Sequence, residues 1–162
     1  MELTEKQQDL VRNQIPAIGL VTAYYGRFGE EALEVSRIFA LQLGKGMGER
    51  IRSAMQVTGT DAVAVGDVLN TFLLRASGAP IGTPDLVVVE GDKVIAVNEG
   101  FCAIMEAARA IGAPHEKICR NYSWPIFEGI ASAVNPGVKQ EVRESRALGD
   151  SRCRHVIVVP IH

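Results

Sequence analysis

The stretch DLVVVEGDKVIAVNE, residues 85–99, decides the fold class. Two apolar segments flank Gly91-Asp92, and a two-residue connection of this kind selects a primed hairpin turn. The sequence therefore predicts an antiparallel pair of strands over residues 85–90 and 93–98. A second hairpin is predicted near the end of the chain, where residues 138–145 lead through a turn at Gly149-Asp150 into residues 153–160.

Helical patterns surround the hairpins. Apolar spacing predicts the longest helix over residues 29–56, with glutamates in its first turns, where the helix dipole favours acids. Gly44, Gly46 and Gly48 lie inside this helix, and each costs about 1 kcal/mol relative to alanine, which indicates a kink or close packing. The other predicted helices are residues 5–11 capped by Thr4, Pro16 to Arg27, Asp61 to about Leu74, residues 101–111, and residues 115–134 with an interruption near Tyr122 and Pro125.

These elements predict one α+β domain. Two hairpins and several helices without β-α-β alternation are typical of a four-stranded antiparallel sheet with helices on one face. We expect a single domain over residues 1–162, mostly helical over 1–77 and built of hairpin, helices and hairpin over 85–162.

Composition excludes several classes of function. The 162 residues carry a net charge of −2 and are 47% hydrophobic and 22% charged, which is typical of a globular domain and argues against a nucleic-acid partner. The longest apolar runs are far shorter than the roughly 20 residues that span a bilayer. The polar start MELTEKQQDLVRNQ is unlike a secretion signal, and three cysteines are an odd number, so we expect free thiols and a cytoplasmic location.

Candidate chemistry lies in the last third of the chain. On the predicted C-terminal strand, side chains alternate between faces, so Cys153 and His155 should point the same way. That pair suits a nucleophile with its base, or two metal ligands, and Arg152 and Arg154 would favour a thiolate. Each residue also has a structural interpretation: a buried thiol, a core histidine and, for Asp150, a turn residue.

Several segments of the chain together form a recognisable pattern. They are YGRFGEEALEVSRIF (residues 25–39), Cys102 followed by Glu106-Ala107-Ala108, Gly112-Ala113-Pro114 before Cys119, Asn135-Pro136, and Gly149-Asp150 before Cys153. With these segments the chain resembles the L-2-amino-thiazoline-4-carboxylic acid hydrolase-like proteins, which are related to the 4-vinyl reductase domain of small-molecule sensors. The resemblance covers most of the chain and implies an α+β fold with a small, largely enclosed pocket between helices and sheet.

The resemblance also bears on metal binding. Zinc-containing 4-vinyl reductase domains hold the metal at positions that match Cys119, Val142, Ser145 and Cys153. The family has a glutamate and a cysteine where this chain has valine and serine, and two thiolates make a poor site where four ligands are usual. We therefore expect no metal and no other cofactor, unless another residue completes the shell. The residues that could do so are Cys102, Glu144 and His155.

A hydrolase of this family would open a small heterocyclic amidine of the 2-amino-thiazoline-4-carboxylate type. Water or a thiolate attacks the sp² carbon, and the ring nitrogen leaves after protonation by a general acid. Cys119 or Cys153 would be the nucleophile, and His155 the acid/base. Asp150 is the candidate orienting group, and Arg120 could bind a substrate carboxylate bidentately.

Two non-catalytic alternatives remain. A sensor would bind an apolar or aromatic small molecule in the same pocket without turning it over, although aromatic residues at helical spacing more often belong to the core. A scaffold would form a homodimer by burying the mixed face of the long helix against a second copy. The candidate ligand-binding residues are Tyr24, Tyr25, Phe28, Cys102, Arg120, Tyr122, Trp124 and Phe127.

Overall fold

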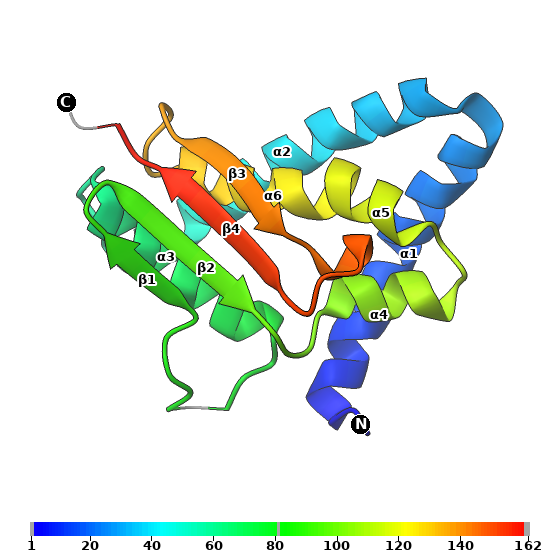
Figure 1. Cartoon of the computed structure of the whole chain (residues 1–162), viewed down its shortest axis with the longest axis horizontal. Coiled ribbons are helices and arrows are strands. Elements are labelled where there is room, and N and C mark those ends of the chain that lie inside the picture. The colour runs from blue at the N-terminus through cyan, green and yellow to red at the C-terminus, as the bar shows by residue number, and fades with distance from the viewer. Residues whose placement is uncertain (1, 81, 161–162) are drawn as a thin grey trace.

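Two hairpins form a single antiparallel sheet. In the computed structural model, which describes residues 2–80 and 82–160, β1 (Val87–Glu90) pairs with β2 (Lys93–Asn98), and β3 (Lys139–Glu144) pairs with β4 (Cys153–Val158). β2 and β4 are the central neighbours, so the strand order is β1-β2-β4-β3 (Figure 1). Both predicted hairpins and the α+β class are confirmed.

The first hairpin turns at the predicted dipeptide. Glu90 pairs with Lys93, which leaves Gly91 and Asp92 as a two-residue loop, and Gly91 has φ +63°. A positive φ at the first loop position is what a type II′ turn requires, and glycine adopts it without strain. The second hairpin has a longer connection that contains a short 3-10 turn, η2 (Arg146–Leu148).

Helices cover one face of the sheet, as Figure 1 shows. α3 packs against β1 and β2, and α6 packs against β3. The N-terminal end of α3 is capped as predicted, because the Asp61 carboxylate accepts the backbone N–H of Ala64 at 2.9 Å. The helices are α1 (Glu5–Phe28), α2 (Glu30–Ala54), α3 (Ala62–Ala76), α4 (Ala103–Ala110), α5 (His115–Ile118) and α6 (Trp124–Ser132).

α1 is one helix, and the prediction of two separate helices in this segment was wrong. Thr4 caps it in a capping box with Gln7, as expected, but the helix runs on through Pro16. The proline ring removes one backbone hydrogen bond. Ile18 and Val21 follow it and are buried in the core. Full burial of such a side chain contributes about 1.5–3 kcal/mol, which offsets the loss.

α2 is the longest helix, as predicted, and crosses α6 at very short range. A Cβ built on Gly48 would lie 2.6 Å from the carbonyl oxygen of Ile130, and one built on Gly44 would overlap the backbone of Ile126. Close packing at these glycines is therefore confirmed. Gly46 differs, because the space around its Cβ position is open.

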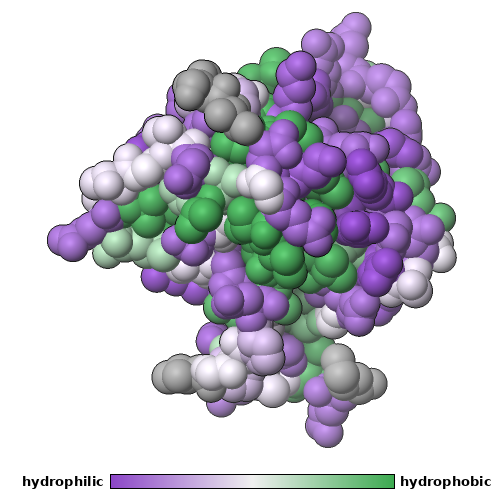
Figure 2. Space-filling model, turned by 60° about the vertical axis from the view of Figure 1, so that its left-hand side comes forward, coloured by the Kyte–Doolittle hydropathy of each residue, from purple (hydrophilic) through white to green (hydrophobic). Residues whose placement is uncertain are grey.

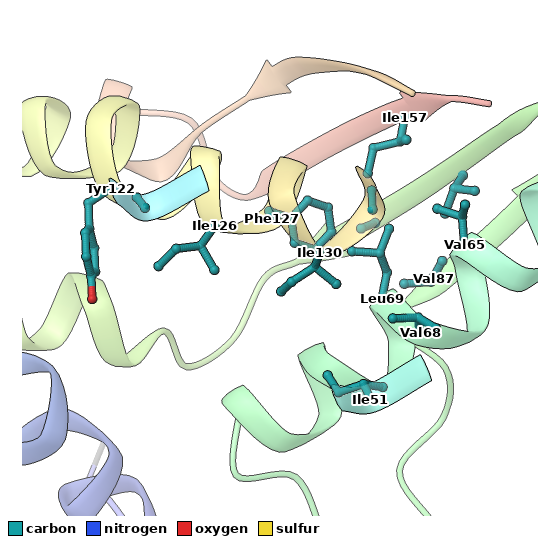
Figure 3. Close-up of a cluster of buried hydrophobic side chains, with 14 of the residues drawn as sticks. Ile51, Val65, Val68, Leu69, Val87, Tyr122, Ile126, Phe127, Ile130 and Ile157 are labelled. Atoms are coloured by element: carbon teal, nitrogen blue, oxygen red, sulfur yellow. The ribbon is translucent and has the colours of Figure 1, made fainter. Parts of the chain in front are cut away.

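The core lies between the sheet and the helices. Val65, Val68 and Leu69 of α3 meet Ile157 of β4 and Ile130 of α6, and all five side chains are fully buried (Figure 3). Burial of these side chains holds α3 and α6 against the sheet, and both helices then contribute residues to the same interior.

Apolar side chains also reach the surface. On β1, the edge strand, Val88 and Val89 are exposed. Figure 2, turned so that the left-hand side of Figure 1 comes forward, shows hydrophobic residues in the middle of this face, framed by hydrophilic ones. Over the described residues, no helix combines the length and the apolar character needed to cross a membrane.

Candidate functional site

A cavity of about 600 Å³ lies between the sheet and the helices. Its walls come from α1, α2, α3, α4, α6, β2 and β4. Pockets for small molecules are usually 300–1,000 Å³ and mostly apolar, and this cavity fits both descriptions. The largest apolar side chains in its walls are Leu43, Met47, Phe72, Phe101, Ile126 and Phe127.

Cys153 and His155 both line this cavity. They lie on β4 with one residue between them, so their Cα atoms are about 6.6 Å apart at the usual strand rise. His155 sits in the middle of the sheet, between Ala96 of β2 and Val142 of β3. The alternation of the C-terminal strand thus brings the two predicted residues to one site.

The imidazole of His155 is held in an apolar environment. Its ring centroid lies 4.8 Å from that of Phe127. Burial lowers the pKa of His155 to about 4, because the low-dielectric surroundings disfavour the charged form. The ring is therefore neutral at physiological pH. Nδ1 is buried and has no hydrogen-bond partner among the described residues.

Cys153, the first residue of β4, has a polar neighbour in the turn before that strand. Its sulfur accepts the backbone N–H of Arg146 at 3.5 Å, and the side chain is only partly buried. Cys102, the residue before α4, also lines the cavity. Burial raises the pKa of the Cys102 thiol, so this thiol stays protonated. Of these two cavity thiols, Cys153 is the better candidate nucleophile.

Cys119 is placed differently. It is buried in η1 (Cys119–Ser123) and is not among the residues that line the cavity. Burial is the main cause that raises its pKa to about 12. A thiol with such a pKa carries almost no thiolate at neutral pH, and the thiolate is the reactive form. The environment of Cys119 therefore favours a structural role.

Asp150 and Arg120 lie away from the cavity. Asp150 is exposed, and its carboxylate accepts the backbone N–H of Ser145 at 2.7 Å, which closes the turn before β4. Arg120 is exposed as well: it pairs with Glu116 at 2.8 Å, and its guanidinium lies 5.0 Å from the ring centroid of Trp124. The structure brings neither residue to His155 or to the cavity.

The aromatic candidates divide into two groups. Tyr122 and Phe127 line the cavity, and burial raises the pKa of the Tyr122 phenol. Trp124 and Tyr25 do not line it; Tyr25 lies instead beneath the ammonium of Lys117, 5.6 Å from the ring centroid. Of these four aromatic residues, Tyr122 and Phe127 reach the cavity, and Trp124 and Tyr25 do not. Tyr24 and Phe28 are exposed.

The interruption predicted near Tyr122 is a π-helical turn. η1 connects α5 to α6 without a break in the helical rod, and Tyr122 and Ser123 within it line the cavity. The widened turn is stabilised by Asn121, whose side-chain amide donates to the carbonyl of Lys117 at 3.0 Å. Single π turns in helices occur frequently at functional sites, and this one shapes the cavity wall.

Sequence reasoning missed the walls from the first half of the chain. Gln14 of α1, Arg50 of α2 and Arg75 of α3 contribute polar groups, and both arginines are exposed at their helix surfaces. A signal was present in α2, where Leu43 and Met47 are four residues apart and thus share a helix face. The pattern alone did not show that this face meets the strand that carries His155.

No metal centre is evident in the described part of the chain, where no three histidine, cysteine, aspartate or glutamate side chains come close enough to share an ion. Ser145, one of the positions implied by the resemblance, is buried with its hydroxyl unpaired, and Val142 lies opposite His155 in the sheet. The expectation that the chain holds no zinc stays a prediction.

Comparisons with known proteins give no relative. No protein-family model matches the chain, and no curated protein gives a significant match. The resemblance to the thiazoline hydrolase-like family stays a prediction for this reason. Function is therefore argued from the cavity and its lining.

Proposed function

We propose that this chain binds a compact, mainly apolar small molecule in the cavity beside His155. The observation that carries the proposal is a cavity of about 600 Å³ with a mainly apolar lining and a neutral imidazole on its wall. Apolar surface supplies most of the affinity in such sites, while a few polar groups orient the ligand. A sensor or carrier domain needs no more than this.

The polar side chains of the cavity wall restrict which class of ligand can bind. Cys102, Cys153, Tyr122 and His155 are all uncharged or weakly polar donors and acceptors on the inner wall. A neutral imidazole donates from one nitrogen and accepts at the other, which suits a phenol or a small nitrogen heterocycle. The strand side of the cavity carries no charged group, and the two arginines of the lining, Arg50 and Arg75, are exposed on the helix side, so the inner wall favours an uncharged ligand.

A thermal-shift panel tests the proposal. Phenols, small heterocyclic acids and nucleotides are compared, since ligand at 100 times Kd stabilises the folded state by about 2.7 kcal/mol. Met47→Trp fills part of the cavity and should remove the shift; Leu148→Trp, at an exposed site outside the cavity, should keep it. A response confined to nucleotides, or a full response in Met47→Trp, would overturn the proposal.

A hydrolase that opens a cyclic amidine is the second candidate, favoured by the placement of Cys153 and His155 on one cavity wall. The neutral imidazole would take the thiol proton as the sulfur attacks the sp² carbon. The imidazolium would return that proton to the ring nitrogen as the C–N bond breaks, and water would then release the product. Cys153→Ser should abolish ring opening and retain ligand binding, whereas Cys102→Ser should retain both.

We propose two further properties. The order of helices and hairpins, together with a cavity between the helices and the sheet, supports a 4-vinyl reductase-like fold. Large apolar side chains exposed on α1 and α2, such as Phe28 and Val35, support association with a second copy of the chain. Both are independent of whether the cavity ligand is turned over.

A further inference from the structure

The helical hairpin formed by α1 and α2 carries a large exposed apolar surface. The two helices meet at Gly29, at the end of the molecule away from the sheet (Figure 1). Seven large apolar side chains on them are between 37% and 67% exposed: Leu20, Tyr24, Phe28, Val35, Ile38, Phe39 and Leu43. Because an aromatic side chain has a surface of about 150–250 Å², the summed exposed area of the seven side chains is roughly 700 Å². Monomers rarely expose more than about 300–600 Å² in one patch, and a stable interface needs about 800 Å² per partner.

The exposed residues of α2 form a stripe at helical spacing. Residues three or four positions apart lie on one face of a helix, and this spacing links Val35 to Ile38 and Phe39, and both of these to Gln42. Gly46 continues this face and leaves open space where a side chain would stand. Such a stripe is what one helix presents to another in a coiled-coil-like contact.

We propose that α2 packs antiparallel against α2 of a second copy, around a two-fold axis at Ile38. This inference rests on the self-association proposed above and adds its geometry. Symmetric pairs about a two-fold axis use the same surface on both copies. At the axis the Ile38 side chains of the two copies meet, and Phe39 of each copy lies one residue from the axis.

Charges at the edge of the stripe set the register. Glu31 and Lys45 lie seven residues before and after Ile38, and their separation of 14 positions is close to four helical turns of about 3.6 residues. Both therefore lie on the same edge of the stripe, and in an antiparallel pair the same edges meet. Glu31 of each copy then faces Lys45 of the other. Neither residue forms an ion pair within the described part of its own chain.

This self-complementarity favours a second copy over a membrane. The acidic residues Glu31 and Glu34, exposed beside the stripe, would be repelled by anionic lipid, whereas amphipathic helices that lie on membranes are rich in basic residues on the polar face. The interface also reaches the cavity, because Leu43 belongs to the exposed surface and to the cavity wall. A second copy seated on α2 therefore buries Leu43, the residue that the exposed surface and the cavity wall share.

Sedimentation equilibrium of the full chain between about 1 and 100 µM tests the pairing. The wild type should dimerise, and Phe39→Glu should be monomeric with an unchanged melting temperature, because Phe39 is 58% exposed within its own chain. Lys93→Glu, an exposed charge reversal on the sheet, is the matched control and should leave the dimer intact. A wild type that stays monomeric at 100 µM would overturn the inference together with the proposed self-association.

Charge reversal tests the register separately. Lys45→Glu alone and Glu31→Lys alone each create two like-charge contacts and should weaken the dimer about tenfold. The double variant Glu31→Lys with Lys45→Glu restores opposite charges and should recover the wild-type dissociation constant. If both single variants dimerise like the wild type, or the double variant stays weak, the antiparallel register is wrong while self-association and ligand binding stand.

Discussion

Gly44 of α2 and Gly129 of α6 face each other where the two helices cross: a Cβ added to Gly129 would lie 3.0 Å from the Cα of Gly44. No side chain separates the backbones at this point. The short crossing holds α6 in a defined rotation, and this rotation directs Ile126 and Phe127 into the cavity. The geometry of the site thus depends on residues that have no side chain.

Adding a methyl group at this crossing should destabilise the fold. Gly44→Ala places a Cβ against the backbone of Ile126, which cannot move without shifting α6. Overpacking of this kind costs roughly 1–3 kcal/mol, occasionally more. Gly46→Ala is the control: its Cβ meets open space, so it should stabilise the helix by roughly 0.5–1 kcal/mol. Urea unfolding of both variants measures the difference, and equal effects would contradict the role of the crossing.

Much of the fold was predictable because its signals are local. The turn at Gly91 and the apolar segments on either side of it specify a hairpin without reference to the rest of the chain. The exception was α1, where Pro16 indicated the start of a second helix, although α1 continues through it. Burial of Ile18 and Val21 against distant elements outweighed that signal. A sequence pattern does not contain the energy of contacts that form only in the folded chain.

The orientation of the site residues was predictable along β4. A strand has a side-chain period of two, so Cys153 and His155 could be assigned to one face without a structure. The helical residues were harder to place, because the π turn of η1 changes the helical phase at Tyr122. With that shift, Tyr122 and Phe127 reach the cavity and Trp124 does not. The walls from α1 and α3 depend on packing that no local pattern reports.

Cys153 and Cys119 should react with iodoacetamide in a defined order. Cys153 is partly exposed at the cavity and should be alkylated first in the native protein. Cys119 is buried, with its pKa raised to about 12, and should react only after unfolding, because the thiolate is the reactive form. Peptide mapping by mass spectrometry after timed labelling gives the order. Alkylation of Cys119 before Cys153 would contradict the environments described for both.

Zinc binding tests the resemblance independently of the cavity. The wild type should contain no stoichiometric zinc after purification without added metal. Val142→Glu with Ser145→Cys supplies the two ligand types that the family has beside Cys119 and Cys153, and a set of four ligands is usual for zinc. Elemental analysis of the double variant should then show zinc, lost again on Cys153→Ser. A double variant that folds and binds no zinc would argue against the mapping of these positions.

His155 should make the stability of the fold depend on pH. Burial lowers its pKa from 6.5 to about 4 in the folded chain. Between these values the unfolded chain binds a proton that the folded chain does not, so the free energy of unfolding falls as the pH decreases through this window. The loss should reach about 2 kcal/mol between pH 7.5 and pH 5 at 1.36 kcal/mol per pKa unit, and it should level off below about pH 4.

The matched variant is His155→Leu, which removes the titrating group and keeps an apolar side chain beside Phe127. Its own stability at pH 7.5 can differ from that of the wild type; only the change with pH is compared. Hydrogen bonding to Arg152 lowers the pKa of Glu144. The stability that this carboxylate contributes is therefore lost only at pH values below the interval compared. Urea unfolding at pH 7.5 and pH 5 therefore isolates the imidazole. If His155→Leu loses as much stability as the wild type over this interval, the buried neutral histidine is not the cause.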